Sequence, residues 1–332
     1  MKKVVTLGEI MLRLSTVAEA RMAESTTFAA DYGGGEANVA ISLANYGHQV
    51  AFASKVSANP LGLAVKQHLH KYGVDTSFLL EGGERLGTYY LENGVGLRSS
   101  NVVYDRKYSS FSMMDTLEWE LDALFAETEV LLLSGITPAL SAVWRQMTLL
   151  LAKEAKARGV KVVLDVNYRG KLWSVEACSK FLREIAGLVD ILSAGQLDAL
   201  NFFKVPERAA ADLTYYYGEI AKRYPNIQAF YSTTREVVNA NHNYLQGNLY
   251  VNGRLYQSVN YDIHDIVDRV GGGDAYTAGI LHGFLSDFEP QKTVEFAALA
   301  SAMKHTVHGD HNQFSAQEIE ELLQRGVKEI KR

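Results

Sequence analysis

Short apolar runs alternate with longer amphipathic segments along most of the chain. Six runs are short and partly β-branched, as buried parallel strands usually are: Val4–Gly8, Val50–Ser54, Val130–Ser134, Val160–Asp165, Ile191–Ser193 and Ile227–Ser232. Eight longer segments have helical spacing of their apolar residues: Glu36–Tyr46, Leu61–Tyr72, Ala142–Ala157, Val175–Ala186, Glu207–Arg223, Asp274–Leu285, Gln291–His305 and Ala316–Ile330. The alternation predicts an α/β protein with a doubly wound, mainly parallel sheet covered by helices on both faces.

Glycine and proline mark the ends of several predicted helices. A glycine follows three of them, where a left-handed residue often ends a helix: Gly47, Gly73 and Gly159. A proline stands at the start of three others, where its missing N–H costs no helical hydrogen bond: Pro60, Pro206 and Pro290.

Two segments interrupt the alternation, Ser15–Tyr32 and Arg85–Ser112. The second contains the apolar runs Thr88–Leu91 and Val102–Tyr104, with glycines between them, which predicts a hairpin. We therefore expect one domain over residues 1–332, with a small β-sheet lid made of about 13–32 and 85–112 inserted into the α/β core.

Composition excludes several classes of protein. The 332 residues are 47% hydrophobic and 21% charged, with a formal net charge of −5 and one cysteine, Cys178. These values fit a folded chain with a large core and exclude a disulfide framework. The mild acidity argues against a nucleic-acid partner, and the apolar runs are too short to span a membrane. No signal-peptide pattern follows Lys2 and Lys3, so we expect a cytoplasmic protein without a membrane partner.

The strongest chemical signal is the segment Asp268–Gly279, DRVGGGDAYTAG, in which Gly271, Gly272 and Gly273 precede a helix. Glycines let the backbone approach a ligand, and the free N–H groups at a helix start attract an anion. Asp274 at the same point could accept a proton from a hydroxyl, which suits phosphoryl transfer. The alternative is a plain glycine turn with Asp274 as an ordinary helix cap.

A second triple glycine, Gly33, Gly34 and Gly35, also leads into a helix. Asn38 stands where the last glycine of a dinucleotide-binding fingerprint belongs, and the sequence has no Walker-type Gly-Lys-Ser/Thr. The segment therefore favours close approach to a polyhydroxyl ligand, with Asn38 reaching its hydroxyls, or else a loop-to-helix turn without a ligand.

In this order and at this separation, the two glycine motifs resemble the two signatures of the ribokinase-like (PfkB) sugar kinases. The resemblance runs from Gly8-Glu9 to Gly309-Asp310. It implies a three-layer α/β fold with a small β-sheet lid, Asp274 as catalytic base, and the later glycines as an anion hole for the γ-phosphoryl group. The early glycines would bind the sugar.

Further segments resemble one subgroup of that family, the 2-keto-3-deoxygluconate kinases. They are Leu164–Trp173, Tyr104–Arg106, Arg235–Val237 and Gly309-Asp310. The resemblance implies acid-sugar recognition, with charge-assisted hydrogen bonds from two arginines. The implied substrate residues are Arg106 and Arg169 at the acid end, the covering tyrosines, and a carboxylate near the reacting hydroxyl: Tyr89, Tyr90, Tyr104 and Asp310. Each arginine could instead form a surface salt bridge, and each tyrosine could serve packing.

The expected nucleotide-binding residues also follow from the resemblance. ATP would lie among Ser232–Arg235, Ile263–Val270 and the helix around Ala298–His305, which implies contacts from a defined set: Ser232, Thr233, Thr234, Arg235, His264, Gly271, Gly273, Ala302 and His305. Arg269 would either approach the phosphates or pair with Asp265 or Asp268.

The expected cation site departs from the family pattern. Many members have Asn-x-x-Glu where this chain has Gly195 and Asp198, so Asp198 is the candidate for hydrated Mg²⁺. A monovalent cation also remains possible. His305, His308 and His311 are spaced by three, but Gly309 is expected to end their helix, which favours a polar or nucleotide-pocket edge over a shared metal.

We therefore expect ATP-dependent phosphorylation of the terminal hydroxyl of 2-keto-3-deoxygluconate by direct in-line transfer to a hydroxyl deprotonated by Asp274. The alternatives are a related kinase of fructose or of 2-keto-3-deoxygalactonate, and a non-catalytic sugar-acid sensor. Sheet edges in the lid favour a homodimer, with a higher oligomer possible. Because the chain is acidic, the positive potential for two anionic ligands must be local.

Overall fold

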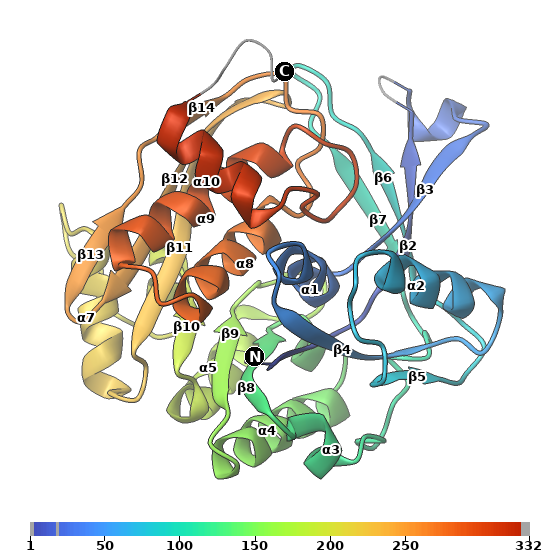
Figure 1. Ribbon diagram of the computed structural model, residues 1–332, viewed down its shortest axis with the longest axis horizontal. Helices are drawn as coiled ribbons and strands as arrows, with labels where there is room; N and C mark the ends of the chain where they lie inside the picture. The colour runs from blue at the N-terminus through green and yellow to red at the C-terminus, as the bar shows by residue number, and fades with distance from the viewer. Residues whose placement is uncertain (1–2, 18–19, 327–332) are drawn as a thin grey trace.

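The computed structural model describes residues 3–17 and 20–326, and a ten-stranded sheet runs through its centre (Figure 1). The strand order is β13-β12-β11-β10-β9-β8-β1-β4-β5, with β14 paired to β12. Neighbours from β5 to β11 are parallel, whereas β11, β12, β13 and β14 pair antiparallel. The strands are β1 (Lys3–Leu7), β4 (Gln49–Val56), β5 (Leu79–Glu81), β8 (Thr128–Ser134), β9 (Lys161–Asp165), β10 (Ile191–Ser193), β11 (Ala229–Asn239), β12 (His242–Val251), β13 (Arg254–Gln257) and β14 (Tyr261–Ile263).

Helices cover both faces of this sheet because successive strand residues point to opposite sides. In β1, Val5 and Leu7 pack into one core and Val4 into the other. The first core is closed by α4 (Ala142–Ala157), α5 (Val175–Ile185) and α7 (Leu213–Arg223). The second is closed by α1 (Gly35–Asn45), α2 (Pro60–Lys71), α8 (Gly272–Leu285), α9 (Pro290–Lys304) and α10 (Ala316–Arg325). The predicted α/β class with a doubly wound, mainly parallel sheet is confirmed.

Short elements complete the chain. The sequence did not predict α3 (Leu121–Phe125) and α6 (Gln196–Asn201), which are only 5 and 6 residues long. Three single-turn 3₁₀ segments lie at Met22–Glu24, Thr137–Ala139 and Ala186–Leu188. None of the helices in the described part of the chain combines the length and apolar character needed to cross a membrane.

The glycine predictions at helix ends are confirmed, since Gly47, Gly73 and Gly159 all have positive φ, between +74° and +88°. The helix expected over Glu207–Arg223 is shorter, because Asp212 caps its start by accepting a hydrogen bond from the Thr214 N–H (3.0 Å). Pro206 therefore precedes the helix by several residues.

Two other boundaries differ from the prediction. The helix expected over Ala316–Ile330 ends at Arg325, and its remaining predicted residues after Gly326 lie outside the described residues. Strand β11 is longer than expected because it pairs along its length with β12, a strand that the sequence did not predict.

A second, four-stranded sheet stands beside the main one, in the order β3-β2-β6-β7 (Figure 1). Its strands are β2 (Met11–Thr16), β3 (Phe28–Gly33), β6 (Thr88–Glu92) and β7 (Asn101–Asp105). The predicted hairpin is confirmed as the antiparallel pair β6–β7. The two inserted segments thus meet in one small sheet, joined by the parallel pair β2–β6.

Candidate active site

A cavity of about 1240 Å³ lies between the small sheet, the carboxyl ends of β9 and β10, the middle of β11, and the start of α8. Its volume exceeds the roughly 300–1,000 Å³ typical of sites for one small ligand, so two substrates fit together. Among its lining residues are most of the predicted ones: Gly33, Gly34, Gly35, Asn38, Tyr89, Tyr104, Arg106, Arg169, Ser232, Thr233, Gly271, Gly272, Gly273, Asp274 and Asp310.

The start of α8 forms one wall of this cavity. Gly271 precedes the helix with φ +80°, a left-handed conformation that glycine adopts without strain. A Cβ at this position would lie 1.5 Å from the backbone oxygen of Asp310, so the loop carrying Asp310 packs directly against Gly271. The first-turn N–H groups of α8 have no helical partner and provide an anion-binding surface beside Asp274.

Asp274 is held by a residue of the early glycine motif. The Asn38 side-chain amide donates to the Asp274 carboxylate across 2.7 Å, and Asn38 itself is buried in α1. Burial is the main cause that raises the pKa of Asp274 to about 7; nearby Asp165 and Asp310 contribute to the rise, while the Asn38 bond and Arg169 oppose it. The carboxylate is therefore a stronger base than an ordinary aspartate, and Asn38 orients it.

The inner face of the small sheet is a row of paired residues. Arg13 of β2 lies opposite Asp31 of β3 and Tyr89 of β6, and Tyr89 lies opposite Tyr104 of β7. Directly opposed residues share a face, and Tyr89 and Tyr104 of this row line the cavity. Tyr90, next along β6, points the other way and contacts Phe28 edge to face; it does not line the cavity, contrary to its predicted substrate contact.

Asp310 is the centre of a buried polar network. It accepts hydrogen bonds from Arg13 and from the Tyr89 hydroxyl, and Arg13 also forms an ion pair with Asp268 at 2.5 Å. Burial alone would lower the pKa of Arg13, but Asp310 and Asp268 raise it, which keeps the guanidinium charged. Asp310 therefore positions the small sheet against the core as well as lining the cavity.

The two predicted carboxylate-binding arginines lie in the same cavity with different partners. Arg106 is 9% exposed and is paired with Glu9, which also accepts from Ser109. Arg169 is exposed in the cavity and donates to the Tyr168 carbonyl at 3.3 Å. Arg169 thus has the guanidinium available for a ligand, whereas Arg106 is fixed by Glu9 and presents its remaining N–H groups.

Acidic side chains gather where β9 and β10 end. Asp165 lines the cavity beside Ser193 and Asn167, and burial raises its pKa. Asp198 does not line the cavity, and one of its oxygens accepts from the Gly195 N–H (2.7 Å) at the start of α6. Burial raises the pKa of Asp198 to about 6, and Asp165 adds repulsion. Two close carboxylates with raised pKa values fit a hydrated cation, with Asp165 as the group that reaches the cavity.

The predicted nucleotide contacts divide into two groups. Ser232 and Thr233 line the cavity from within β11, whereas the next two residues of the strand, Thr234 and Arg235, are exposed and do not line it. The remaining three predictions lie elsewhere: His264, Ala302 and His305. His264 is exposed and bonded to Asp262, Ala302 belongs to a small apolar core, and His305 is buried under Gly272 with its Nδ1 against the Ser301 carbonyl at 2.7 Å.

Arg269 does not form the predicted ion pair with Asp265 or Asp268, and its approach to the phosphates stays a prediction. It lines the cavity and donates to the backbone carbonyls of Ala240 (2.7 Å) and Asn239 in the β11–β12 turn. The same turn is bonded to the β6–β7 loop, where Gly96 donates to Asn241 and accepts from the Ala240 N–H, both at 2.8 Å. The tip of the small sheet is thus joined to the main sheet beside the cavity.

Five residues at or next to the cavity were not among the predicted site residues: Asp165, Lys107 and Lys171, which line it, and Arg13 and Glu9, which bond the lining residues Asp310 and Arg106. Arg13 carried a usable signal, because it stands at an inward position of an alternating strand, MLRLST, where an apolar residue would be ordinary. The lysines carried none, since a lone lysine is usually a solvated surface residue. Basic side chains therefore surround this cavity although the whole chain is acidic.

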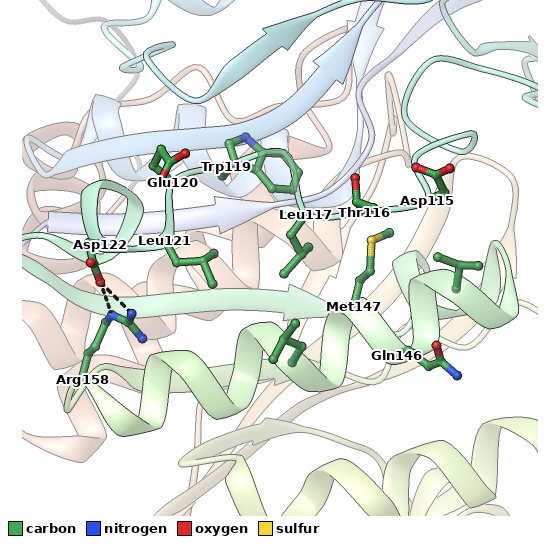
Figure 2. Close-up of a pocket in the computed structure, with 12 residues that line it drawn as sticks. Asp115, Thr116, Leu117, Trp119, Glu120, Leu121, Asp122, Gln146, Met147 and Arg158 are labelled. Carbon is green, nitrogen blue, oxygen red and sulfur yellow. Dashed lines mark hydrogen bonds and ion pairs between the residues drawn. The ribbon is translucent and has the colours of Figure 1, made fainter.

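A second depression of about 660 Å³ lies on another part of the surface, between residues 115–122 and α4 (Figure 2). Leu117, Trp119 and Met147 are among its lining residues, and Asp122 forms an ion pair with Arg158 at 2.7 Å. This depression therefore offers apolar contacts and an ion pair. It has neither the glycine-rich helix start nor the exposed Arg169 guanidinium that the larger cavity has.

The chain matches the family described as "pfkB family carbohydrate kinase" over residues 1–317. It therefore belongs to the PfkB family of carbohydrate kinases, and the fold and the kinase activity implied by its glycine motifs are confirmed. A phosphotransferase site needs a base beside an anion-binding loop, and Asp274 at the start of α8 is the group in this cavity that meets that description.

Relatives with this architecture include enzymes of sugar acids. The chain is 28% identical to "2-dehydro-3-deoxygalactonokinase" of Haloferax volcanii, covering 98% of this chain and 97% of that one. It is also 28% identical to "2-dehydro-3-deoxygluconokinase" of Bacillus subtilis, covering 92% and 90%. A crystal structure of 2-dehydro-3-deoxygluconokinase from Thermotoga maritima superposes with a TM-score of 0.94 at 38% identity, covering 98% and 100%.

Proposed function

We propose that this kinase phosphorylates the terminal hydroxyl of 2-keto-3-deoxygluconate with ATP. The observation that carries the proposal is that Arg169, which is exposed, lines the same cavity as Asp274 and the glycine-rich helix start. A sugar acid spans such a site with its carboxylate on the arginine and its far hydroxyl at the base. The two curated relatives named above act on sugar acids, which agrees with this arrangement.

In the proposed reaction, the substrate hydroxyl attacks the γ-phosphorus of ATP as Asp274 accepts its proton. A new oxygen–phosphorus bond forms, the bond from that phosphorus to the bridging oxygen breaks, and ADP leaves with the electron pair. The N–H groups at residues Gly271–Asp274 stabilise the charge on the transferring group. Mg²⁺, held near Asp165 and Asp198 through water, would neutralise charge on the phosphates when bound. The small sheet acts as a lid that limits competing water.

The raised pKa of Asp274 predicts a pH dependence. A base must be ionised to act, and an aspartic acid with a pKa of about 7 becomes protonated as the pH falls through that value. We expect log kcat/KM to fall with a slope of about one unit per pH unit below about pH 7. His305, whose pKa burial lowers to about 4, titrates outside this window. A profile that stays flat to pH 5, in protein shown by circular dichroism to be folded, would contradict the assignment.

Replacing Arg169 by leucine tests the acid end of the site. A hydrogen bond to a charged group contributes roughly 1.5–3 kcal/mol, so kcat/KM for the sugar acid should fall about 10–150-fold. The loss should appear mainly in KM, because Arg169 binds a part of the substrate that does not react. An exposed arginine on β13, Arg254, provides the matched control as Arg254→Leu. If the two substitutions changed kcat/KM equally, the assignment of Arg169 to substrate binding would be wrong.

A substrate panel tests the proposed function directly. Purified protein with Mg-ATP is offered 2-keto-3-deoxygluconate, 2-keto-3-deoxygalactonate, fructose and ribose, and ADP release is measured. We expect kcat/KM to be highest for the gluconate compound, then for its galactonate epimer, with both above the neutral sugars. A preference for fructose would replace the acid-sugar proposal with the neutral-ketose alternative, and release with none of the sugars above background would favour a sensor.

The proposed homodimer concerns the small sheet. Its outer strands β3 and β7 leave edges, and Val103 is 45% exposed on β7. Exposed apolar strand edges favour pairing with a second copy. Light scattering coupled to gel filtration measures this, and a Val103→Lys variant is expected to shift the mass toward the monomer.

A further inference from the structure

Asp31, His68 and His311 meet beside the active-site cavity, although they come from three separate parts of the chain. Each offers one ligand atom, and these atoms all lie within 4.8 Å of one another. Asp31 is on β3 of the small sheet, His68 is on α2, and His311 follows the α9 helix next to Asp310. In Figure 1, α2 and β3 lie on the same side of the molecule.

The imidazoles of this cluster lack the hydrogen bonds that buried polar groups normally have. His311 is 2% exposed, and both of its ring nitrogens are buried without a partner. The Nε2 of His68 is buried and unpartnered as well. Leaving such a group unsatisfied costs roughly 1–3 kcal/mol, so three in one place need an explanation.

We propose that Asp31, His68 and His311 form a binding site for one Zn²⁺ ion. Two imidazoles and one carboxylate are a ligand set that zinc takes in proteins, with water completing a tetrahedron. Bonds of about 2.0–2.1 Å require ligand atoms roughly 3.3 Å apart, so small rotations of the three side chains close the site. The metal accepts the lone pairs that nothing else in the surroundings uses.

The charges facing the cluster favour the ligating form of its histidines. Burial, together with nearby His68, Lys304 and Lys71, lowers the pKa of His311 to about 3. Burial also lowers the pKa of His68, with Lys71 adding to the shift and Asp31 opposing it. Both imidazoles are thus neutral at pH 7, as metal binding requires, and the Asp31 carboxylate offsets the neighbouring ammonium groups.

The ring packing keeps the two imidazoles in place. The His68 ring lies 5.2 Å from that of His311 and 5.4 Å from Tyr32, and Tyr72 packs against both histidines at 5.3 and 4.5 Å. A bound ion would tie β3 of the small sheet to α2 and to the loop that presents Asp310. It would therefore stabilise the arrangement in which the small sheet sits over the cavity.

The other group of this kind among the described residues provides a contrast. His242 and His264 already bond the Asp262 carboxylate, at 2.8 and 3.0 Å, and the site is largely exposed. Histidines that already bond a carboxylate have less to gain from a metal than His311 and the Nε2 of His68, which are buried without a partner. This second group serves as an internal control for the zinc proposal.

The test uses the full chain after treatment with a chelator, without ATP. Zn²⁺ is titrated by calorimetry, and Co²⁺ is added separately because four-coordinate Co²⁺ has strong visible absorption. We expect one equivalent to bind with a rise in Tm, and 1 mM Mg²⁺, which prefers oxygen ligands, not to compete. Failure to bind either metal below about 100 µM would overturn the proposal.

Four variants locate the site. Because losing a partner outside the ligand shell already costs roughly 10–100-fold in metal affinity, His68→Gln and His311→Gln should each lose at least as much. His70→Gln, on the exposed side of the same helix, and His264→Gln, in the second group, should bind as the parent does. If His264→Gln lost metal binding while His68→Gln retained it, the metal would be assigned to the second group and the proposal would be overturned. If His311→Gln does not fold, the partly exposed His68 decides the question.

Discussion

Asn in place of Asp274 is expected to lower kcat roughly 10²–10⁴-fold while the KM for the sugar changes little. The amide keeps the size of the side chain and can still accept from Asn38, so the cavity wall is preserved. It cannot take the hydroxyl proton, which is the step assigned to the carboxylate. Steady-state ADP release with sugar and Mg-ATP, together with calorimetric sugar binding, separates the two effects.

Stability gives this variant a second, independent readout. Burial raises the pKa of Asp274 in the folded state above its value in the unfolded chain. The unfolded chain therefore ionises first, and the free energy of unfolding falls as the pH rises from the unfolded pKa toward about 7. Asparagine does not ionise, so at pH 8 the Tm of Asp274→Asn should equal or exceed that of the parent. Asp265→Asn is the matched control, since Asp265 is exposed with φ +53° and asparagine tolerates that conformation. Near-normal turnover by Asp274→Asn would remove the base from the mechanism.

Gly271→Ala should damage both the fold and the activity. The residue needs φ +80°, and the new methyl group would overlap the Asp310 carbonyl oxygen. Left-handed strain costs roughly 1–2 kcal/mol and overpacking about 1–3 kcal/mol, so Tm should fall by roughly 5–15 °C. Displacing the N–H donors of the helix start should also lower kcat/KM about 10²–10³-fold.

Gly273→Ala is the matched comparison within the same loop. A Cβ at Gly273 would meet no atom within 4 Å, so its Tm should stay near that of the parent. The methyl group would nevertheless enter the cavity beside Asp274, and we expect it to raise the KM for ATP. Equal thermal losses in the two alanine variants would show that the packing of Gly271 against Asp310 is not what the loop depends on.

The backbone of the fold was largely predictable because its signals are local. Six strand runs and the glycines after three helices depend on hydrophobic spacing and on the conformations available to a single residue. The prediction failed where the signal came from pairing, as in β12, which is stabilised by strands on both sides. It also failed at the helix after Pro206, where the cap at Asp212 lies further along the chain.

The candidate site was predictable to the extent that it is written in contiguous motifs. The residues Gly271 to Asp274 lie together at the start of one helix, and the early glycines lie together at the start of another. The partners of these groups come from elsewhere in the sequence. Asn38, predicted as a sugar contact, bonds Asp274, and Arg106 is held by Glu9. Such pairings depend on the positions of the strand ends in the tertiary structure, which cannot be read directly from the sequence.

By itself, the sequence determined the α/β class, the two glycine-rich helix starts and the acidic net charge, because each follows from composition or from neighbours along the chain. Tertiary structure alone decided which face each side chain takes and which distant groups share one environment. It turned Tyr89 inward and Tyr90 outward through strand alternation, and it buried Arg13 between Asp268 and Asp310. It also brought His68 and His311 together without other partners, since packing in three dimensions sets burial and electrostatic environment.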